Sequence, residues 1–221
     1  MQKICSPMKS NPHFFYSNFF SDTGIFKDLF EKSGNVWEVL KTLESYIVSK
    51  KKELIQKGYS ERFKNVFVGK NVTISEFCTI EGSAILADNT SIGHGAYLRD
   101  GVLLGENVHV GHAAELKHSV VLKNTAVAHF NYIGDSIIGK DANIGGGAIL
   151  ANWRFDEKSI EVRYKNKKID TGLTKFGAII GDKCKIGANA VLNPGTVLQK
   201  NVLVYPLVSV RGTYEEASIV K

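Results

Sequence analysis

Aliphatic residues recur at every sixth position from Val68 to Leu122 without exception. A second set, mostly of smaller residues, lies two positions before each following member of the first. Because side chains two apart on an extended segment share a face, each pair predicts a short strand with two inward side chains, followed by a corner. A short fixed period is typical of a solenoid, so we predict a parallel β-solenoid. The first set is Val68, Ile74, Ile80, Leu86, Ile92, Leu98, Leu104, Val110, Leu116 and Leu122, and the second is Val72, Cys78, Ala84, Thr90, Ala96, Val102, Val108, Ala114, Val120 and Ala126.

The aliphatic ladder is interrupted twice before it ends at Val210. Between Leu122 and Ile138 the spacing falls two residues short of three repeats, and we place this loss across residues 128–134. In residues 151–176, aliphatic residues do not recur at the six-residue spacing. This predicts a loop of about residues 151–177 that leaves the solenoid. Its seven basic and four acidic side chains leave it basic. Function is expected where an otherwise regular pattern breaks.

Two helical patterns precede the solenoid, a short one at residues 25–30 and a longer one at residues 36–57. Asn35 and Glu38 have the spacing of a capping box, and Gly58 is a stop signal. The apolar stripe of the longer helix is Val36, Leu40, Leu43 and Ile47.

With 221 residues, the chain is long for one small domain and short for two large ones. We predict a helical extension over residues 1–60 and a solenoid domain over residues 61–215. The helices are expected to cover the open end of the first coil, whose unpaired strand edge would otherwise invite aggregation.

The composition, with 43% hydrophobic and 23% charged residues, excludes a disordered or collagen-like chain. The uncharged stretches are too short and mixed to cross a bilayer, and the N-terminus lacks the apolar core of a signal peptide. Cys5, Cys78 and Cys184 have no metal-type spacing, and their odd number argues against a disulfide framework. We therefore expect a cytoplasmic protein with no membrane partner and no bound metal.

The net charge of +6 and the pI of about 9.1 fit either a nucleic acid or a small anionic ligand. The densest basic run, residues 50–52, lies at a predicted helix end, where positive charge is favourable. No aromatic platform or nucleic-acid-binding motif accompanies it. We expect no nucleic-acid partner.

The six-residue pattern resembles the hexapeptide-repeat family over roughly residues 66–212. That resemblance implies three flat sides and 18 residues per coil, with left-handed winding, although the general crossover rule favours a right hand. The expected fold is mainly β, a single-stranded left-handed parallel β-helix with an N-terminal helical cap.

With 18 residues per coil, Arg99 and Lys117 lie on adjacent strands about 5 Å apart. Like charges facing each other across strands are unfavourable unless an anion lies between them, and a phosphate would suit both groups. Two other interpretations stay open: the side chains splay into water, or Asp135 completes an Arg-Lys-Asp ladder.

Several separated segments are similar to one branch of the family, the acetyltransferase half of the bifunctional enzyme that makes UDP-N-acetylglucosamine. The loop also resembles that of archaeal-type sugar-phosphate nucleotidyltransferases with the same C-terminal β-helix. In that branch, the amine of glucosamine-1-phosphate attacks the thioester of acetyl-CoA in a site between subunits of a trimer. The matching segments are Leu98–Gly101, Glu115–Lys117, Ala128–Asp135, Asn143–Gly147, Asn152–Lys158, Asp170–Gly172, Lys175–Asp182 and Pro194–Gly195.

The resemblance assigns His129 as the general base and acetyl-CoA as the co-substrate. A base that titrates near neutrality suits this role, because an ammonium must lose its proton before it can attack. Backbone N–H groups of residues 145–147 are candidate donors to the thioester oxyanion. The sugar-phosphate residues implied are Arg99, Lys117, Tyr132, Asn143, Asn152 and Lys158, and the CoA residues are Gly146 and Ala188. Candidates for the phosphates of CoA are Lys183, Lys185, Lys200 and Arg211.

Three features depart from this branch. The first sixty residues hold no nucleotidyltransferase motif, which argues against uridylyl transfer by this chain. Trp153 replaces a common Tyr and leaves the sugar open, and the short segment up to Lys221 leaves CoA affinity open.

Two other function classes compete with an N-acetyltransferase that acts on a hexosamine-1-phosphate. A carbonic-anhydrase-like zinc enzyme would use His94, His112 and His118, with His109 nearby; metal analysis tests it. A non-catalytic β-helix subunit would partner a separate nucleotidyltransferase, which a pull-down would detect.

Overall fold

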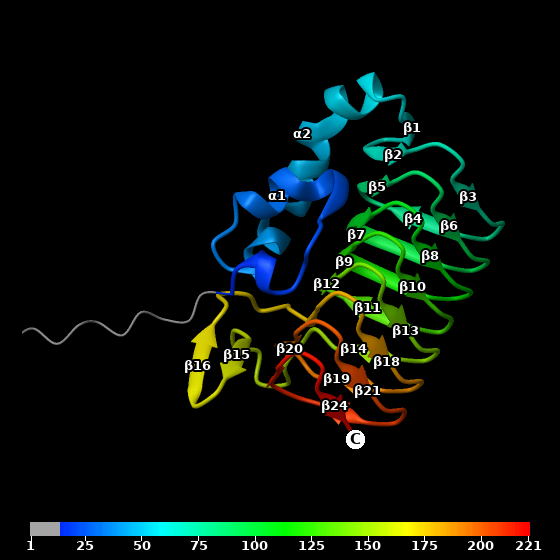
Figure 1. Cartoon of the computed structure of the whole chain (residues 1–221). Helices are drawn as coiled ribbons and strands as arrows, with labels where there is room; N and C mark the ends of the chain where they lie inside the picture. Colours follow the sequence, from blue (N-terminus) through cyan, green and yellow to red (C-terminus); the bar gives the residue numbers. More distant parts are fainter. Residues whose placement is uncertain (1–13) are drawn as a thin grey trace, which may run out of the picture.

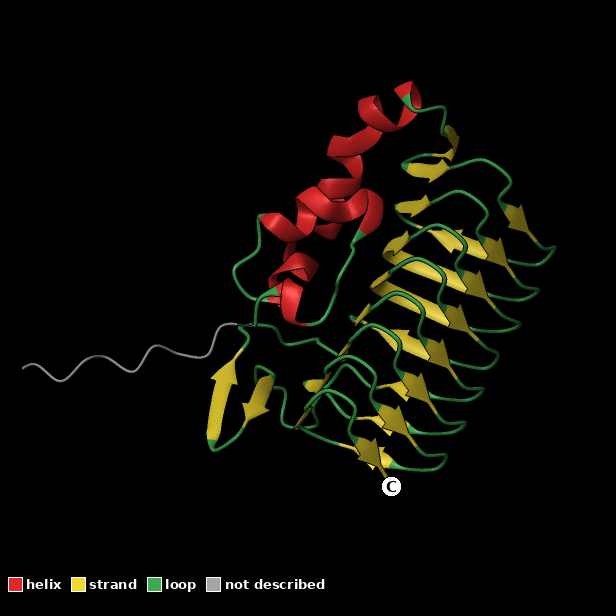
Figure 2. Cartoon of the chain, viewed as in Figure 1, coloured by secondary structure: helices red, strands yellow, loops and turns green. Residues whose placement is uncertain are grey.

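The computed structural model describes residues 14–221, so Cys5 and most of the segment considered as a signal peptide lie outside the described residues. From Val66 onward the chain winds into a parallel β-helix whose short strands stack from coil to coil (Figure 1). Within the described range, helices occur only before this solenoid (Figure 2). The predicted mainly β solenoid is thereby confirmed.

The strands form three flat faces, numbered 1 to 3 in the order in which the chain meets them, and two long strands bend from face 3 into face 1. We call the turns from face 1 to 2, from face 2 to 3 and from face 3 to 1 corners A, B and C. The long strands are β7 (Tyr97–Leu104) and β9 (Glu115–Val121). Face 1 also holds β2 (Val66–Val68), β5 (Ala84–Leu86), β12 (Ile137–Ile138), β17 (Ala178–Ile180), β20 (Thr196–Leu198) and β23 (Thr213–Tyr214). Face 2 consists of β3 (Thr73–Ile74), β6 (Ser91–Ile92), β8 (His109–Val110), β10 (Ala126–Val127), β13 (Asn143–Ile144), β18 (Lys185–Ile186), β21 (Leu203–Val204) and β24 (Ile219–Val220). Face 3 also holds β4 (Thr79–Glu81), β11 (Tyr132–Gly134), β14 (Ile149–Leu150), β19 (Val191–Leu192) and β22 (Ser209–Val210).

The interior is the predicted ladder of aliphatic side chains up to Leu116, but the register then changes. Leu104 pairs with Val121, so Leu122 is not a member of the ladder. Val121 pairs in turn with Ile138. Both missing residues are lost at corner C, one on each of two successive coils, so the prediction of a single loss across residues 128–134 is wrong.

The changed register fills the small inward slots of these coils with buried polar residues instead of Val120 and Ala126. Their side chains donate to backbone carbonyls, as Ser119 Oγ does to Lys117 at 2.7 Å, which offsets the cost of burying them. Cys184 fills an inward slot as predicted, and burial raises the pKa of its thiol to about 12. The polar inward residues are Ser119, Thr125, Asn131 and Ser136.

The N-terminal helices lie along face 1 and do not cover the open end of the first coil, so that prediction is wrong (Figure 1). Outward apolar side chains of face 1 form one core with Trp37, Leu40 and Ile47 of the cap, and burial of this surface stabilises the contact. The first coil is edged by β1 (Ser60–Phe63), which pairs antiparallel with β2. The face 1 residues in this core are Phe67, Ile85, Leu103, Val120, Leu122, Ile137, Ile179 and Val197.

The cap contains two α-helices, α1 (Lys27–Glu31) and α2 (Leu43–Gln56), and 3-10 turns at Tyr16–Asn18, Gly24–Phe26 and Val36–Thr42. The predicted capping box is wrong, because Asn35 Oδ1 accepts from the N–H of Phe14 at 3.0 Å and Glu38 Oε2 from that of Gly34 at 3.0 Å. The second helix ends just before Gly58, as predicted. Between residues 14 and 221, no helix is both long and apolar enough to cross a membrane.

The loop at about residues 151–177 leaves the prism at corner C. The N–H of Phe176 donates to the carbonyl of Asn152 at 2.9 Å, and this hydrogen bond joins the two ends of the loop. The loop contains an antiparallel hairpin, β15 (Glu161–Tyr164) and β16 (Lys167–Asp170). Buried Val162 and Phe176 join the core between cap and face 1. The hairpin therefore belongs to the packed structure.

Candidate active site

Arg99 and Lys117 are paired neighbours where face 3 meets corner C, as predicted. Carboxylates of the chain itself surround them. Asp100 Oδ2 lies 3.1 Å from Arg99 Nη1 and 3.7 Å from Lys117 Nζ, and Glu115 Oε1 accepts from Arg99 Nε at 2.8 Å. Asp100 thus bridges the two cations, where one of the three interpretations left open by the sequence put a ligand phosphate. Asp135 lies 3.4 Å from Lys117 Nζ and completes the Arg-Lys-Asp ladder that was the open alternative.

Asp135 is the buried acid of the site, with 4% of its surface exposed. One oxygen accepts from His118 Nδ1 at 2.9 Å, and the other accepts from the side-chain amide of Asn152. Burial raises the pKa of Asp135, but the hydrogen bonds from His118 and Asn152 and the charge of Lys117 outweigh it and hold the pKa below its usual value. An ionised Asp135 therefore fixes three polar side chains at corner C.

Tyr132 and Asn152 meet over Gly134, on the same corner. A Cβ on Gly134 would lie 2.7 Å from Tyr132 Cε1 and 2.8 Å from the Asn152 amide, so only glycine leaves room for both. Burial raises the pKa of Tyr132, and the charges of Asp135 and Glu115 add to that effect. Four of the predicted sugar-phosphate residues, Arg99, Lys117, Tyr132 and Asn152, are therefore brought together.

Sequence reasoning missed Asp100, Glu115 and His118 as part of this cluster. Each lies next to, or two residues before, a residue that was predicted. On a strand, residues two apart share a face, so Glu115 could have been paired with Lys117 from spacing alone. Asp100 has a φ of 59°, and this corner conformation turns its carboxylate back toward both cations.

His129 lies at corner B, on the other edge of face 3. It is exposed, and a Cβ on Gly146 would lie 3.0 Å from the Cδ2 and Nε2 atoms of its ring, so the absence of a side chain there makes room for the imidazole. The carbonyl of His129 accepts from Gly147 N–H at 2.8 Å, and that of Gly146 accepts from Asn189 N–H at 2.9 Å. His129, Gly146 and Ala188 thus follow one another down a single corner.

One chain does not bring His129 next to the cation pair. Gly134, which pairs with Lys117, is separated from His129 by the bend at Phe130 and by strand β11. The two groups stand at opposite edges of face 3. A ligand that meets both must span this face, or the two groups must come from different chains.

The remaining predicted site residues lie apart from both groups. Asn143 points outward from face 2, and Lys158 is exposed on the loop. Lys183 and Lys200 lie at corner A, across face 2 from Gly146 and Ala188. Lys200 Nζ donates to the carbonyl of Ser17 at 3.3 Å, so it is tied to the N-terminal segment. Lys185 lies on face 2, and Arg211 follows β22 at corner C, so the candidate CoA residues are spread over face 2 and all three corners.

The histidines of the zinc alternative divide between two corners. His94 and His112 stack at corner B with ring centroids 5.6 Å apart, whereas His118 faces Asp135 at corner C. Over residues 14–221, no three His, Cys, Asp or Glu side chains are grouped to hold a metal ion.

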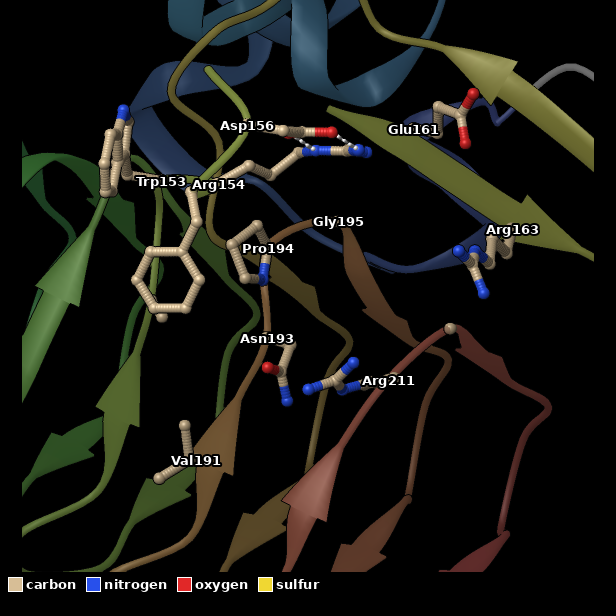
Figure 3. A pocket seen from close by; sticks show the side chains of 13 residues that line it. Trp153, Arg154, Asp156, Glu161, Arg163, Val191, Asn193, Pro194, Gly195 and Arg211 are labelled. Carbon is tan, nitrogen blue, oxygen red and sulfur yellow. Dashed lines mark hydrogen bonds and ion pairs between the residues drawn. The ribbon is translucent and has the colours of Figure 1, made fainter. Parts of the chain in front are cut away.

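A pocket of about 570 Å³ lies between the loop and the coils that follow it in the chain (Figure 3). Loop residues, among them Trp153, Phe155 and Arg163, form one wall. The coils after the loop form the other, with Pro194 and Arg211. We call this the loop pocket.

Comparison with known proteins shows the family. Residues 87–164 match the model of the GMPPB C-terminal domain, and residues 176–204 match that of the hexapeptide repeat of succinyl-transferase. The chain is 38% identical over 177 residues to the bifunctional protein GlmU of Methanococcus vannielii, an alignment that covers 77% of this chain and 42% of that protein. The chain belongs to the hexapeptide-repeat acyltransferase family. Its solenoid is accordingly the left-handed β-helix that the repeat predicted.

Other relatives match shorter segments. A bifunctional sugar-1-phosphate nucleotidylyltransferase/acetyltransferase of Sulfurisphaera tokodaii is 38% identical over 86 residues, 39% of this chain and 21% of that protein. Among solved structures, a mutant of AntD, an N-acyltransferase from Bacillus cereus, is 19% identical, with 76% and 81% of the two chains covered and a TM-score of 0.45. The chain described here matches less than half the length of these two curated relatives.

Proposed function

We propose that the chain transfers the acetyl group of acetyl-CoA to the amine of a hexosamine-1-phosphate, in the cytoplasm, as part of amino-sugar nucleotide synthesis. The observation that carries the proposal is the cation pair at corner C. Arg99 and Lys117 hold a bridging anion, Asp100, whose side chain is 47% exposed. A sugar phosphate would replace that carboxylate, because a guanidinium and an ammonium both bind phosphate well.

The neighbouring groups suit the sugar. Tyr132 and Asn152 lie beside the cation pair and offer a hydroxyl and an amide to sugar hydroxyl groups. Asp135 already contacts Lys117 and Asn152, so both side chains are oriented before a ligand binds. The acceptor would meet a site whose polar groups are already ordered, which lowers the cost of binding.

His129 suits the proton transfer. The imidazole is exposed and makes no hydrogen bond within the described part of the chain, so it is free to accept a proton from the acceptor amine. On the next two coils, the positions equivalent to His129 are the small residues Gly146 and Ala188. The N–H of Gly146 donates to no described group and is available to the thioester oxygen as negative charge develops there.

Since His129 and Lys117 stand at opposite edges of face 3, we propose that the site is shared between neighbouring chains of a homotrimer. His129→Ala and Lys117→Ala would each be inactive alone. Unfolded together and reassembled at equal ratio, they would regain about a quarter of the wild-type sites, because each site needs one intact residue from each of two chains. Absence of any regain would contradict the shared site.

The proposed reaction is tested by thiol release from acetyl-CoA with glucosamine-1-phosphate, galactosamine-1-phosphate and nucleotide-linked amino sugars as acceptors. His129→Ala is expected to lower kcat by 10²-fold or more, about the contribution of a general base. His109→Ala, at an exposed histidine on face 2, is the control and should retain the rate. The proposal fails if no sugar is acetylated, or if His129→Ala retains the full rate.

A further inference from the structure

One buried amide lies beside the proposed active site without a role in the reaction. The side chain of Asn131 is 3% exposed and fills the inward slot after corner B, two residues beyond His129. Its Nδ2 donates to the carbonyls of Gly145 and Ala148, at 2.6 and 3.4 Å. Its Oδ1 has no hydrogen-bond partner among residues 14–221. A buried polar atom without a partner costs stability, so its presence requires an explanation.

The repeat shows that this slot does not require an amide. Hydrogen bonds from coil to coil align Asn131 with the inward residue that follows corner B on other coils. Four of these residues are alanines, each at most 1% exposed. Another, Cys78, reaches the Gly93 carbonyl at 2.9 Å with a thiol, which is a weak donor. One coil after Ala148, the turn from Gly187 to Ala190 closes with an N–H to carbonyl distance of 3.3 Å, as the turn one coil after Asn131 does. Alanine at position 131 would therefore fit the fold and leave no unpaired oxygen. The aligned alanines are Ala96, Ala114, Ala148 and Ala190.

The carbonyl of Gly145 and the N–H of Gly146 belong to one peptide unit. The unit is trans, and the carbonyl and N–H of a trans peptide point in opposite directions. Asn131 holds the carbonyl at 2.6 Å from the interior of the prism. The N–H of Gly146 therefore points away from the interior, at the corner that carries the ring of His129.

We infer that Asn131 is a positioning residue for the acetyl transfer, an inference that rests on the proposed function. Its amide fixes the peptide plane that presents the Gly146 N–H to the thioester oxygen. Donation to a peptide carbonyl also polarises the peptide, which strengthens its N–H as a donor where negative charge develops. Gly147 N–H donates to the carbonyl of His129 at 2.8 Å, so the same turn is also tied to the base.

The kinetic test is Asn131→Ala in the thiol-release assay. Loss of an oxyanion donor lowers kcat by about 10²–10³-fold, and a donor that is present but no longer held in place should lose about tenfold or more. The KM for the acceptor should not change, because the cation pair lies at corner C. The Tm should stay close to that of wild type, because alanine fills the same slot on other coils.

Asn131→Thr is the rescue variant. Thr125, also in an inward slot, donates to the carbonyl of Gly139, fourteen residues further on, at 2.7 Å, and Asn131 donates over the same separation. Asn131→Thr should therefore keep kcat within about threefold of wild type, because it keeps a donor to the same peptide. Thr90→Ala is the matched control and should retain the rate, since Thr90 is fully buried and donates to two carbonyls at corner A.

A second measurement needs no turnover. Gly145–Gly146 and Gly146–Gly147 are the only Gly-Gly peptide bonds of the chain, so glycine labelled with ¹³C at the carbonyl and with ¹⁵N gives two carbonyl–amide NMR signals. The first exchanges faster with deuterium, because only Gly147 N–H is bonded, to the His129 carbonyl. Its carbonyl resonance should move upfield in Asn131→Ala and stay near the wild-type position in Asn131→Thr, since a hydrogen bond deshields a carbonyl carbon.

The outcomes separate the inference from the proposed function. If the wild type acetylates no sugar, the proposed function fails, and the Gly145 resonance alone decides whether Asn131 holds this peptide. If the wild type is active and Asn131→Ala retains the full kcat, the inference is overturned while the proposed function stands. An unmoved Gly145 resonance in Asn131→Ala would overturn it too, as would an equal loss of rate in Asn131→Ala and Asn131→Thr.

Discussion

Asp100→Asn should increase the affinity of the chain for a sugar phosphate. The carboxylate of Asp100 contacts both Arg99 and Lys117, and a phosphate that binds these cations must first displace it. Asparagine keeps the shape of the side chain but removes its charge. Asparagine also tolerates the left-handed backbone, with φ of 59° at this corner, so the fold should be unchanged.

The magnitude follows from the exposure of the two contacts. Ion pairs this close to solvent each contribute about 0.2–1 kcal/mol, so displacing both costs about 0.4–2 kcal/mol. That range corresponds to an increase in affinity of about 2-fold to 30-fold. The gain should shrink at high salt, because added ions screen both the displaced pairs and the new ones.

The measurement is the KM for glucosamine-1-phosphate at saturating acetyl-CoA, or the Kd of the sugar phosphate if turnover is slow. Asp141→Asn is the matched control, since Asp141 has a φ of 57° and lies at corner A, away from the cation pair. A KM of Asp100→Asn equal to or higher than that of wild type would refute the reasoning, because Asp100 would then not occupy the phosphate position.

Three further predictions follow from the same contacts. Asp135→Asn should lower the free energy of urea unfolding by about 1–3 kcal/mol at pH 7. Because the pKa of folded Asp135 is lowered, that difference should persist above its ordinary pKa and vanish as the pH falls through the lowered value. Gly146→Ala should reduce kcat about tenfold without changing Tm, because its methyl group displaces the His129 ring by a few tenths of an ångström. Leu122→Ala should cost about 2–5 kcal/mol in urea unfolding, because Leu122 is buried under the cap.

The interior of the β-helix was predictable from the sequence up to Leu116, because only one residue per repeat satisfies the period. Beyond that point the period selects Leu122, whereas the structure places the adjacent aliphatic residue Val121 in the interior. The correct choice puts Ser119 and Asn131 inside, which a rule of apolar interiors rejects. Backbone carbonyls at the corners satisfy these groups, and that satisfaction is visible only in three dimensions.

The position of the cap had a sequence signal that was overlooked. Between the two inward residues of a face 1 strand lies an outward residue, and from β2 to β20 it is apolar on every strand, as at Phe67, Ile85 and Leu103. The corresponding positions of face 2 include Thr73 and His109. An apolar outward stripe with the period of one coil predicts that a second layer covers that face. The contacts of Asp100 were not predictable in the same way, because they depend on the direction of a corner side chain.

The division of the three faces constrains how chains associate. Face 1 is covered by the helices and the β15–β16 hairpin, so of the three faces only face 2 and face 3 are available to a second chain. The edges of face 3 carry His129 on one side and Arg99 with Lys117 on the other. An approach over face 3 would bring the imidazole of one chain toward the cations of its neighbour, which a single prism keeps apart. The cap would thus matter for the proposed reaction, because it occupies face 1 and not the face on which the proposed shared site depends.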